Sequence, residues 1–368
     1  MQDVTNLPFW RLLSRRGGPD VYWTEYFRVT DTWRPEKWIL ESITRNPTGR
    51  PCIAQLIGND PGALARAARE LQRHPVAAID LNLGCPAPVV YRKCAGGGLL
   101  RDPQRLDAIL GALRDAVTAP GVRFTVKTRL GFDRPDGFEA LLGLFARHAP
   151  DLVTVHGRTV SDGYRGDVRQ EWIRLAVRAL KCPVLANGNV DSAARARSLL
   201  AFTGARGLMI GRGCIRNPWL FEQIRADIAG RPGPRPTGRD VFGYIQELWE
   251  ATEPPGSKER LQVEQMKRYL NFIGQAVGAD AGAAAAFLHR IRRSTSRVEF
   301  FELCRGALDH DEPIALVPHA GVVAARNEES GSPMGMERVG ERVADPAADP
   351  VADPAADPVA DPVADPVG

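Results

Sequence analysis

The chain has 368 residues with 44% hydrophobic and 25% charged side chains, which is an ordinary globular composition. Its net charge of +4 is unevenly placed: residues 326–368 contribute −7, which leaves +11 for residues 1–325. A basic body suits a polyanionic partner, although arginines spread over a solvated surface would give the same balance. No run approaches the roughly 20 apolar residues of a membrane helix. The N-terminus also lacks the apolar centre of a secretory signal, so we expect a cytoplasmic protein.

Seven short apolar runs predict buried strands, and they lie at 21–27, 52–58, 77–84, 124–131, 152–158, 183–189 and 207–213. Helical patterns separate them, and such alternation predicts an α/β fold with a parallel sheet and right-handed crossovers. Its length, and the polar residues gathered at the strand ends, favour a (β/α)8 TIM barrel. Because a helix over 7–16 follows Met1 almost at once, we expect the sequence to begin at the end of the first barrel strand.

Composition divides the chain into three parts. Residues 1–230 are predicted to form the barrel, and a linker rich in Pro and Gly (231–238) follows it. Residues 238–310 show helical periodicity without strands and predict a small helical domain. From Val343 the units VADP and AADP repeat, and proline at every fourth residue excludes a helix. We therefore expect residues 326–368 to form a disordered, low-complexity acidic tail.

The segment 80–103 carries the strongest chemical signal. Its predicted strand ends at Asn82, and Gly84-Cys85-Pro86 and a run of three glycines follow. Chemistry in barrels takes place just past the carboxyl ends of the strands, so Cys85 is a candidate nucleophile, metal ligand or proton donor. A lone cysteine is more often a packed core residue, but the surrounding sequence makes that unlikely here. The six cysteines include no CxxC pair, so no metal site is expected.

Cationic side chains follow the next two predicted strands. Lys127 and Arg129 are two residues apart and therefore share one side of a strand. His156 ends the following strand. A lysine directed into a barrel mouth is costly unless it meets an anion. We expect an anionic ligand beside Lys127 and His156.

The last two predicted strands end in Asn187-Gly188-Asn189 and in Gly211-Arg212-Gly213. Barrels commonly bind phosphate in these two loops, where glycine lets the backbone come close. A phosphate site, a cationic Lys/His pair and a poised cysteine together fit a flavin mononucleotide (FMN) enzyme. In such an enzyme Lys127 would stabilise the negative charge at N1/O2 of the reduced flavin.

Several segments resemble, in order, the motifs of bacterial tRNA-dihydrouridine synthases. They are DLNLGCPAPVV (80–90), VKTRLGF (126–132), VHGRT (155–159) with GYRGD (163–167), PVLANGNV (183–190) and GLMIGRGCIRNPWLF (207–221). The resemblance runs from Met1 to about Asp309. It implies FMN as cofactor, NADPH as reductant and tRNA as substrate. It also implies that hydride reaches C6 of a D-loop uracil while Cys85, as general acid, protonates C5.

The same matching assigns roles to further residues. Ligands of the flavin, its phosphate or the base would be Met1, Gln55, Asn82, Lys127, His156, Asn187, Gly188, Asn189, Gly211 and Arg212. Contacts to flavin or RNA would come from Arg129, and contacts to tRNA from Lys267, Arg268, Arg290, Arg292 and Arg293. A solvated helix face explains the last five almost equally well. A monomer is expected.

Two features depart from the family pattern. Members of the family begin with a strand that ends in Ala-Pro-Met, and this chain starts at what resembles that Met, so we hypothesise a missed upstream start. The acidic repeat lies outside the pattern altogether.

Three alternatives stay open. One is an FMN-barrel reductase that acts on free pyrimidines, and another is a non-catalytic tRNA-binding protein built on a decayed barrel. The third is a phosphate-binding lyase or isomerase without flavin, which would leave Gly84-Cys85-Pro86 without a role.

Overall fold

The computed structural model describes residues 4–252 and 258–322. Met1 and the predicted tail (326–368) therefore lie outside the described residues. The strands are β1 (Tyr22–Arg28), β2 (Cys52–Ile57), β3 (Ala78–Leu83), β4 (Arg123–Arg129), β5 (Leu152–His156), β6 (Val184–Asn187) and β7 (Gly207–Met209). The helices are α1 (Leu7–Arg15), α2 (Lys37–Thr44), α3 (Pro61–Leu71), α4 (Pro88–Tyr91), α5 (Pro103–Ala116), α6 (Phe138–His148), α7 (Gln170–Ala179), α8 (Ala193–Thr203), α9 (Arg212–Arg216), α10 (Leu220–Ile228), α11 (Gly238–Thr252), α12 (Glu259–Ile273), α13 (Ala281–Arg293) and α14 (Arg297–Leu308).

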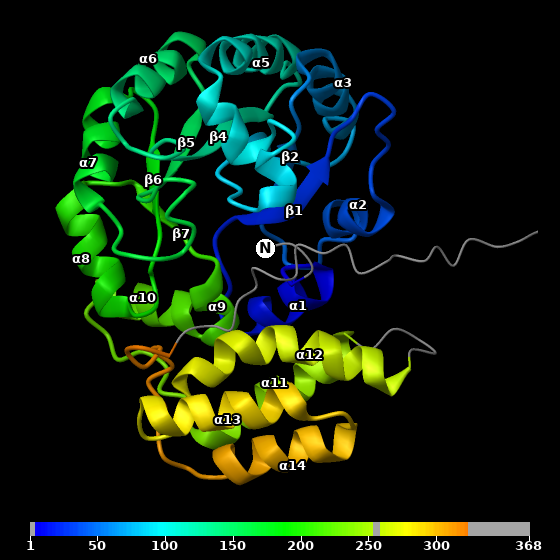
Figure 1. Cartoon of the computed structure of the whole chain (residues 1–368), viewed down its shortest axis with the longest axis vertical. Helices are drawn as coiled ribbons and strands as arrows, with labels where there is room; N and C mark the ends of the chain where they lie inside the picture. Colours follow the sequence, from blue (N-terminus) through cyan, green and yellow to red (C-terminus); the bar gives the residue numbers. More distant parts are fainter. Residues whose placement is uncertain (1–3, 253–257, 323–368) are drawn as a thin grey trace, which may run out of the picture. The chain divides into compact units, whose positions relative to one another are not determined.

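The seven strands form one parallel sheet in chain order, from β1 to β7. Figure 1 shows the sheet curving round a central space, with α3 and α5 to α8 on its outer side. Each predicted strand run overlaps one observed strand, which confirms the α/β fold of barrel type with seven strands. In the described part of the chain, β1 pairs only with β2 and β7 only with β6, so the barrel is open between them.

Local sequence explains where the helices that flank the sheet begin. Asp60 caps α3 and Asp102 caps α5 through side-chain hydrogen bonds to backbone N–H groups, and each is followed by proline in the first turn. Proline has no N–H to lose at that position and its φ already suits a helix. These caps fix the loops that lead from the carboxyl ends of β2 and β3. None of the described helices is long and apolar enough to cross a membrane.

The four helices α11 to α14 pack on the barrel through one continuous apolar core. Tyr269 of α12 donates from its hydroxyl to the carbonyl of Val4 at 3.0 Å, and Tyr244 of α11 donates to the carbonyl of Ile215 at 3.0 Å. The observed elements follow the predicted boundary, because α10 ends at Ile228 and α11 begins at Gly238. Whether the two parts behave as separate domains stays a prediction.

Arg16 joins α1 to the helical part by a bidentate ion pair. Its guanidinium donates to both carboxylate oxygens of Glu247, at 2.6 and 3.1 Å. It also lies 5.3 Å from the ring centroid of Trp219 and 5.2 Å from that of Tyr244. Paired guanidinium–carboxylate hydrogen bonds and aromatic faces are the contacts that arginine makes best.

Arg16→Ala should lower the free energy of unfolding by about 2 kcal/mol, because it removes charge-assisted hydrogen bonds and cation–π contacts from a mostly buried site. Arg15→Ala is the matched control. Its side chain is 69% exposed and its Nη1 lies 3.9 Å from the same carboxylate, so the loss should stay within about 0.5 kcal/mol. Urea unfolding of the two variants measures this, and equal losses would contradict the assignment.

Candidate active site at the carboxyl ends of the strands

The candidate site is built on two rows of residues that are partners in the parallel sheet. Gln55 is the register partner of both Tyr26 and Asp80, and Asn82 is the partner of Lys127 one step further on. A second row runs through Arg129, His156, Asn187 and Met209. Parallel strands bring their carboxyl ends to one edge, so the residues predicted from five separate strand ends do come together.

A chain of hydrogen bonds positions the loop that carries Cys85. Asp80 is fully buried and accepts from Thr125 at 2.6 Å and from Gln55 Nε2 at 2.8 Å. Gln55 Oε1 in turn accepts from Asn82 Nδ2 at 2.8 Å. Asn82 Oδ1 accepts from the backbone N–H groups of Gly84 and Cys85, at 2.9 and 3.0 Å. Gln55 and Asn82 therefore hold the turn at Cys85 through their own amides, whatever else they bind.

The glycine run packs against the inner side of this turn. The backbone N–H of Gly97 donates to the carbonyl of Cys85 at 3.2 Å. A Cβ on Gly97 would lie 2.9 Å from that oxygen and 2.6 Å from Val160, which is too close for any side chain. The Cys85 side chain itself is half-buried, whereas Cys94 is exposed. The geometry thus favours Cys85 over Cys94 as the reactive thiol.

Lys127 lies beside the Cys85 turn. Its Nζ is 3.3 Å from the point that a Cβ on Gly84 would occupy. Burial, with Arg129 next in size, lowers the pKa of Lys127 to about 8, while Asp80 and Cys85 act in the opposite direction. The ammonium is therefore mostly charged at neutral pH but held in a poorly solvated place.

Arg129 organises the loops above the sheet. It is 1% exposed and donates to the carbonyls of Gly84, Thr159 and Gly163, all at 2.7 to 2.8 Å. These bonds tie the Cys85 turn to the loop after β5. The predicted contact of Arg129 with flavin or RNA stays a prediction, while its structural role is visible.

His156 and Arg158 form the next part of the site. Both side chains are buried, and Arg158 Nη1 lies 3.3 Å from His156 Nε2. Burial and the surrounding cations lower the pKa of His156 well below its usual value, so the imidazole is neutral. Burial also lowers the pKa of Arg158 to about 10. A neutral imidazole among cations can donate or accept a hydrogen bond without adding charge.

The predicted phosphate loops meet this part of the site. Gly188 has φ +123°, and a Cβ there would lie 2.9 Å from the His156 ring. Asn187 Nδ2 donates to the carbonyl of Met209 at 2.7 Å and so joins the ends of β6 and β7. Asn189 is exposed with φ +51°, and Gly211 precedes α9. Arg212, half-buried, lies 4.5 Å from the ring centroid of Tyr164.

Cations at this edge of the sheet outnumber the acids near them. In the described residues no carboxylate lies within 4.0 Å of Lys127, Arg158 or Arg212. Arg158 donates to the carbonyls of Arg165 and Gly166, but these neutral groups do not balance its charge. Since buried cations without acidic partners are costly, the site is suited to an anionic ligand. A flavin phosphate and the electron-rich edge of a flavin ring fit that requirement. The described residues contain no cluster of His, Cys, Asp and Glu that could hold a metal ion.

The predicted RNA contacts lie elsewhere, on α12 and α13. Arg268, Arg290 and Arg293 are exposed, whereas Arg292 is half-buried and donates to Asn271 at 3.0 Å. Lys267 is paired with Glu264 at 2.6 Å. Arg290 and Arg293 are therefore the exposed pair on α13, beside His289.

Three residues that the sequence did not predict as site residues belong to the site: Asp80, Arg158 and Tyr164. Asp80 could have been found, because it shares a strand face with Asn82 two residues later. The ring of Tyr164 lies 6.5 Å from that of His156, and Tyr164 belongs to the segment GYRGD (163–167). Nothing in the sequence shows that Tyr26 rather than Glu25 is the partner of Gln55, because a register shift in β1 determines it.

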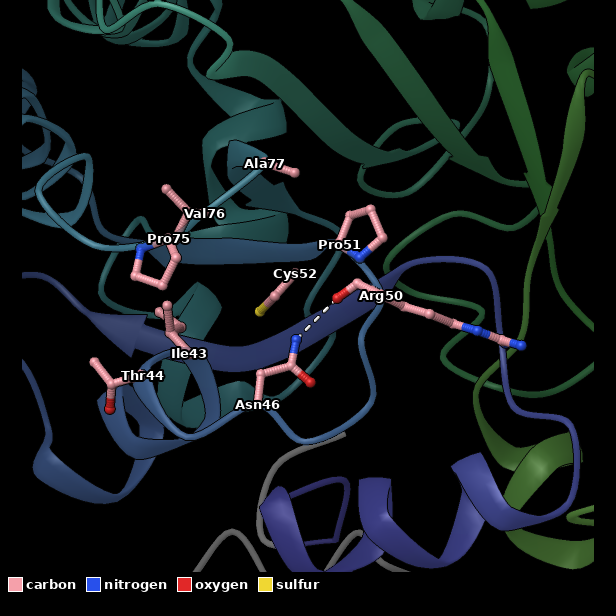
Figure 2. Close-up of a pocket in the computed structure, with 9 residues that line it drawn as sticks. All are labelled: Ile43, Thr44, Asn46, Arg50, Pro51, Cys52, Pro75, Val76 and Ala77. Carbon is pink, nitrogen blue, oxygen red and sulfur yellow. Dashed lines mark hydrogen bonds between the residues drawn. The ribbon is translucent and has the colours of Figure 1, made fainter.

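A hollow of about 420 Å³ lies at the opposite, amino-terminal end of the strands. Figure 2 shows Cys52, the first residue of β2, with Asn46, Arg50, Pro75 and Val76 around it. Burial raises the pKa of the Cys52 thiol to about 12, so it is a protonated, unreactive core thiol. In barrels this face contributes stability rather than chemistry, and the hollow is separate from the candidate site.

Asp80→Asn tests the buried carboxylate through the pH dependence of stability. Burial raises the pKa of Asp80 from 3.8 to about 6. Between these values the folded chain binds more protons than the unfolded chain, so the free energy of unfolding falls as pH rises through this window, by about 2–3 kcal/mol. The variant should lack this fall in a urea-unfolding series from pH 3.5 to 7.

Asp107→Asn is a control with the opposite sign. His148 holds the pKa of Asp107 below its usual value, so that carboxylate adds stability that is lost as the pH falls below about 4. Parallel pH curves for Asp80→Asn and the parent chain would show that Asp80 does not titrate in this window.

Comparison with known proteins agrees with this geometry. The sequence model described as "Dihydrouridine synthase" matches residues 1–302. A tRNA-dihydrouridine(16) synthase of Pseudomonas putida is 34% identical over 268 residues, which cover 71% of this chain and 82% of that protein. A tRNA-dihydrouridine(16) synthase of Neisseria meningitidis is 32% identical over 71% of this chain and 80% of its own length. A tRNA-dihydrouridine synthase B of Pseudomonas aeruginosa is 36% identical over 61% and 67%, respectively.

Proposed function

Because this chain belongs to the dihydrouridine synthase family, we propose that it reduces the C5=C6 bond of a D-loop uridine in tRNA, with FMN bound in the barrel and NADPH as reductant. The observation that carries the proposal is the half-buried Cys85 thiol held beside Lys127, at the edge of the sheet where cations lack acidic partners. When bound, the flavin supplies the hydride for C6 of uracil.

The residues of this chain would divide the remaining work. Cys85 would give its proton to C5. The backbone N–H groups of Gly84 and Cys85 donate to Asn82 Oδ1, and these hydrogen bonds hold the turn that carries the thiol. Lys127 and the neutral His156 would hold the polar edge of the flavin, where the lysine charge opposes the negative charge of the reduced ring. Asn187, Asn189, Gly211 and Arg212 would hold its phosphate.

The target base must leave the RNA stack to reach this site. Tyr164 is 54% exposed, and its ring lies 4.5 Å from the Arg212 guanidinium and 6.5 Å from the His156 ring. Its exposed aromatic face could stack on the unstacked base. Free-pyrimidine reduction remains the alternative of the same chemical class. It gives no role to the exposed arginines of α13, whereas tRNA does.

Site-resolved dihydrouridine mapping of tRNA, from cells with and without the gene, tests the proposal directly. Loss of dihydrouridine at one D-loop position, restored by the parent gene, is the expected result. Restoration by Cys85→Ala should be slower by about 10²- to 10⁴-fold in turnover, because the general acid is gone. Cys94→Ala is the matched control and should restore the modification fully.

Flavin content separates the outcomes of that experiment. Purified Cys85→Ala should keep its flavin, since the cofactor ligands are untouched. An unchanged tRNA map in the deletion strain, together with activity of the purified protein on free uracil, would replace tRNA by a free pyrimidine as substrate.

The α13 arginines should set the salt dependence of tRNA binding. The double substitution Arg290→Ala/Arg293→Ala should weaken binding and reduce the slope of log K against log salt by about 1 to 2, because two phosphate contacts are lost. Lys267→Ala is the control, since Lys267 is already paired with Glu264. Filter binding at several salt concentrations gives the slopes, and identical slopes for all three proteins would place the RNA elsewhere.

A further inference from the structure

The guanidinium of Arg158 makes hydrogen bonds in two directions. On one side Nε donates to the carbonyls of Arg165 and Gly166, at 3.0 and 3.1 Å. On the other side Nη1 lies 3.3 Å from His156 Nε2. The Arg158 side chain is 1% exposed, so water does not compete for these partners. Arg158 is therefore held between the loop that follows β5 and the imidazole of His156.

The contact with His156 determines which ring nitrogen carries the proton. A guanidinium has five N–H donors and no acceptor, so Arg158 must donate and His156 Nε2 must accept. An imidazolium carries a hydrogen on both nitrogens and could not accept this bond. The His156 ring is therefore neutral, with its one proton on Nδ1.

The charged groups around the ring agree with this assignment. Lys127 and Arg129 act on His156 from β4, and Arg212 acts on it from α9. Burial and these cations, together with Arg158, lower the pKa of His156 well below its usual value. A second proton on the ring is thus disfavoured at neutral pH from every side on which a charged group lies.

The Nδ1 atom faces away from the strand that packs against the ring. A Cβ on Gly188, just after β6, would lie 2.9 Å from His156 Cδ2 and 3.1 Å from Nε2. Nδ1 is the ring atom opposite the bond between these two atoms. In the described part of the chain no group forms a hydrogen bond with Nδ1. Because a buried N–H group needs an acceptor, this donor is suited to a ligand.

We propose that Arg158 is a positioning residue for His156: its guanidinium donates to Nε2, keeps the ring proton on Nδ1, and so presents an N–H donor to an acceptor atom of the bound flavin. The identity of that ligand rests on the proposed function, whereas the place of the proton does not. The other tautomer would turn a lone pair towards an electron-rich flavin edge and repel it.

NMR reads the tautomer directly. The full-length protein is labelled with ¹⁵N in its six histidines, and the ring nitrogens are observed at about pH 8, where an unperturbed imidazole is already neutral. The His156 signals are those absent from His156→Gln. Nδ1 should show the shift of a protonated nitrogen both in the protein as purified and after its flavin is removed, because Arg158 rather than the flavin holds the ring. A proton on Nε2 in the flavin-free protein would overturn the proposal.

Two variants separate this role from a structural one. Arg158→Met removes the donor but keeps a long, unbranched side chain, and the proton should move to Nε2, the tautomer that an unconstrained neutral imidazole prefers. Arg169→Met is the matched control, because Arg169 holds the same loop through Asp162 at 2.7 Å but makes no hydrogen bond to His156 in the described residues. It should leave the proton on Nδ1. Movement in both variants, or in neither, contradicts the proposal, and the parent spectra decide if Arg158→Met does not fold.

Binding of FMN to the flavin-free proteins tests the second half of the proposal. Arg158→Met should bind FMN about tenfold more weakly than the parent, since a lone pair replaces one donor, whereas Arg169→Met should bind it equally well. Isothermal titration calorimetry gives the dissociation constants. A moved proton with unchanged FMN affinity would mean that Nδ1 meets no acceptor on the flavin, and that half of the proposal would fail.

This inference and the proposed function can fail separately. The tautomer measurement needs neither tRNA nor flavin. Dihydrouridine retained in the deletion strain would refute the proposed function and leave the assignment of the ring proton intact. Loss of dihydrouridine, together with a proton on Nε2 in the parent protein, would do the reverse.

Discussion

The carboxylate of Asp80 is the constraint on which the site depends. Because an ionised carboxylate only accepts hydrogen bonds, Gln55 must turn its Nε2 towards Asp80. Its Oε1 then faces Asn82. Asn82 must then donate from Nδ2, which leaves Oδ1 for the backbone of Gly84 and Cys85. One buried charge thus sets two amide orientations and, through them, the direction of the turn that carries the thiol. An asparagine in place of Asp80 could donate as well as accept, so the Gln55 amide could also adopt the flipped orientation. The orientation of Asn82, and with it the turn at Cys85, would then no longer be fixed.

The same charge balances the cations above it. Asp80 favours the charged form of Lys127 and Lys127 favours the charged form of Asp80, yet burial opposes both. One carboxylate cannot also compensate Arg158 and Arg212, and Asp162 is already engaged by Arg169 at 2.7 Å. The edge of the sheet therefore stays electropositive until an anion binds. Binding of an anionic flavin would return Lys127 towards its ordinary pKa, so cofactor binding and protonation of this lysine are linked.

Much of this arrangement is predictable from the sequence, for identifiable reasons. Parallel strands carry a strong apolar pattern and end in polar residues, so the sequence predicts the seven strands that the structure contains. The roles of the residues at the strand ends stay predictions. Cys85, Lys127 and His156 follow from position alone. The hydrogen-bond chain from Asp80 to Cys85 does not, since it joins three strands through side-chain orientations. The pairing of Tyr26 with Gln55 is even harder to predict. Strict alternation along β1 would place Glu25 opposite Gln55, and the register shift between Trp23 and Tyr26 changes that pairing.

The helical part is tied to the barrel through the core rather than by a flexible linker, and this bears on how a large substrate could be aligned. In α12, Met266, Tyr269, Leu270 and Ile273 follow the spacing of one helix face and are buried, and Tyr269 reaches the backbone of Val4. Arg268 lies between these positions and is exposed. A helix whose one face is fixed to the barrel must hold its other residues at fixed positions relative to the strand ends. On the proposed function, exposed cations on these helices would hold a long polyanion at a fixed position relative to the barrel. The choice of uridine would then depend on the helices, while the chemistry depends on the strand ends.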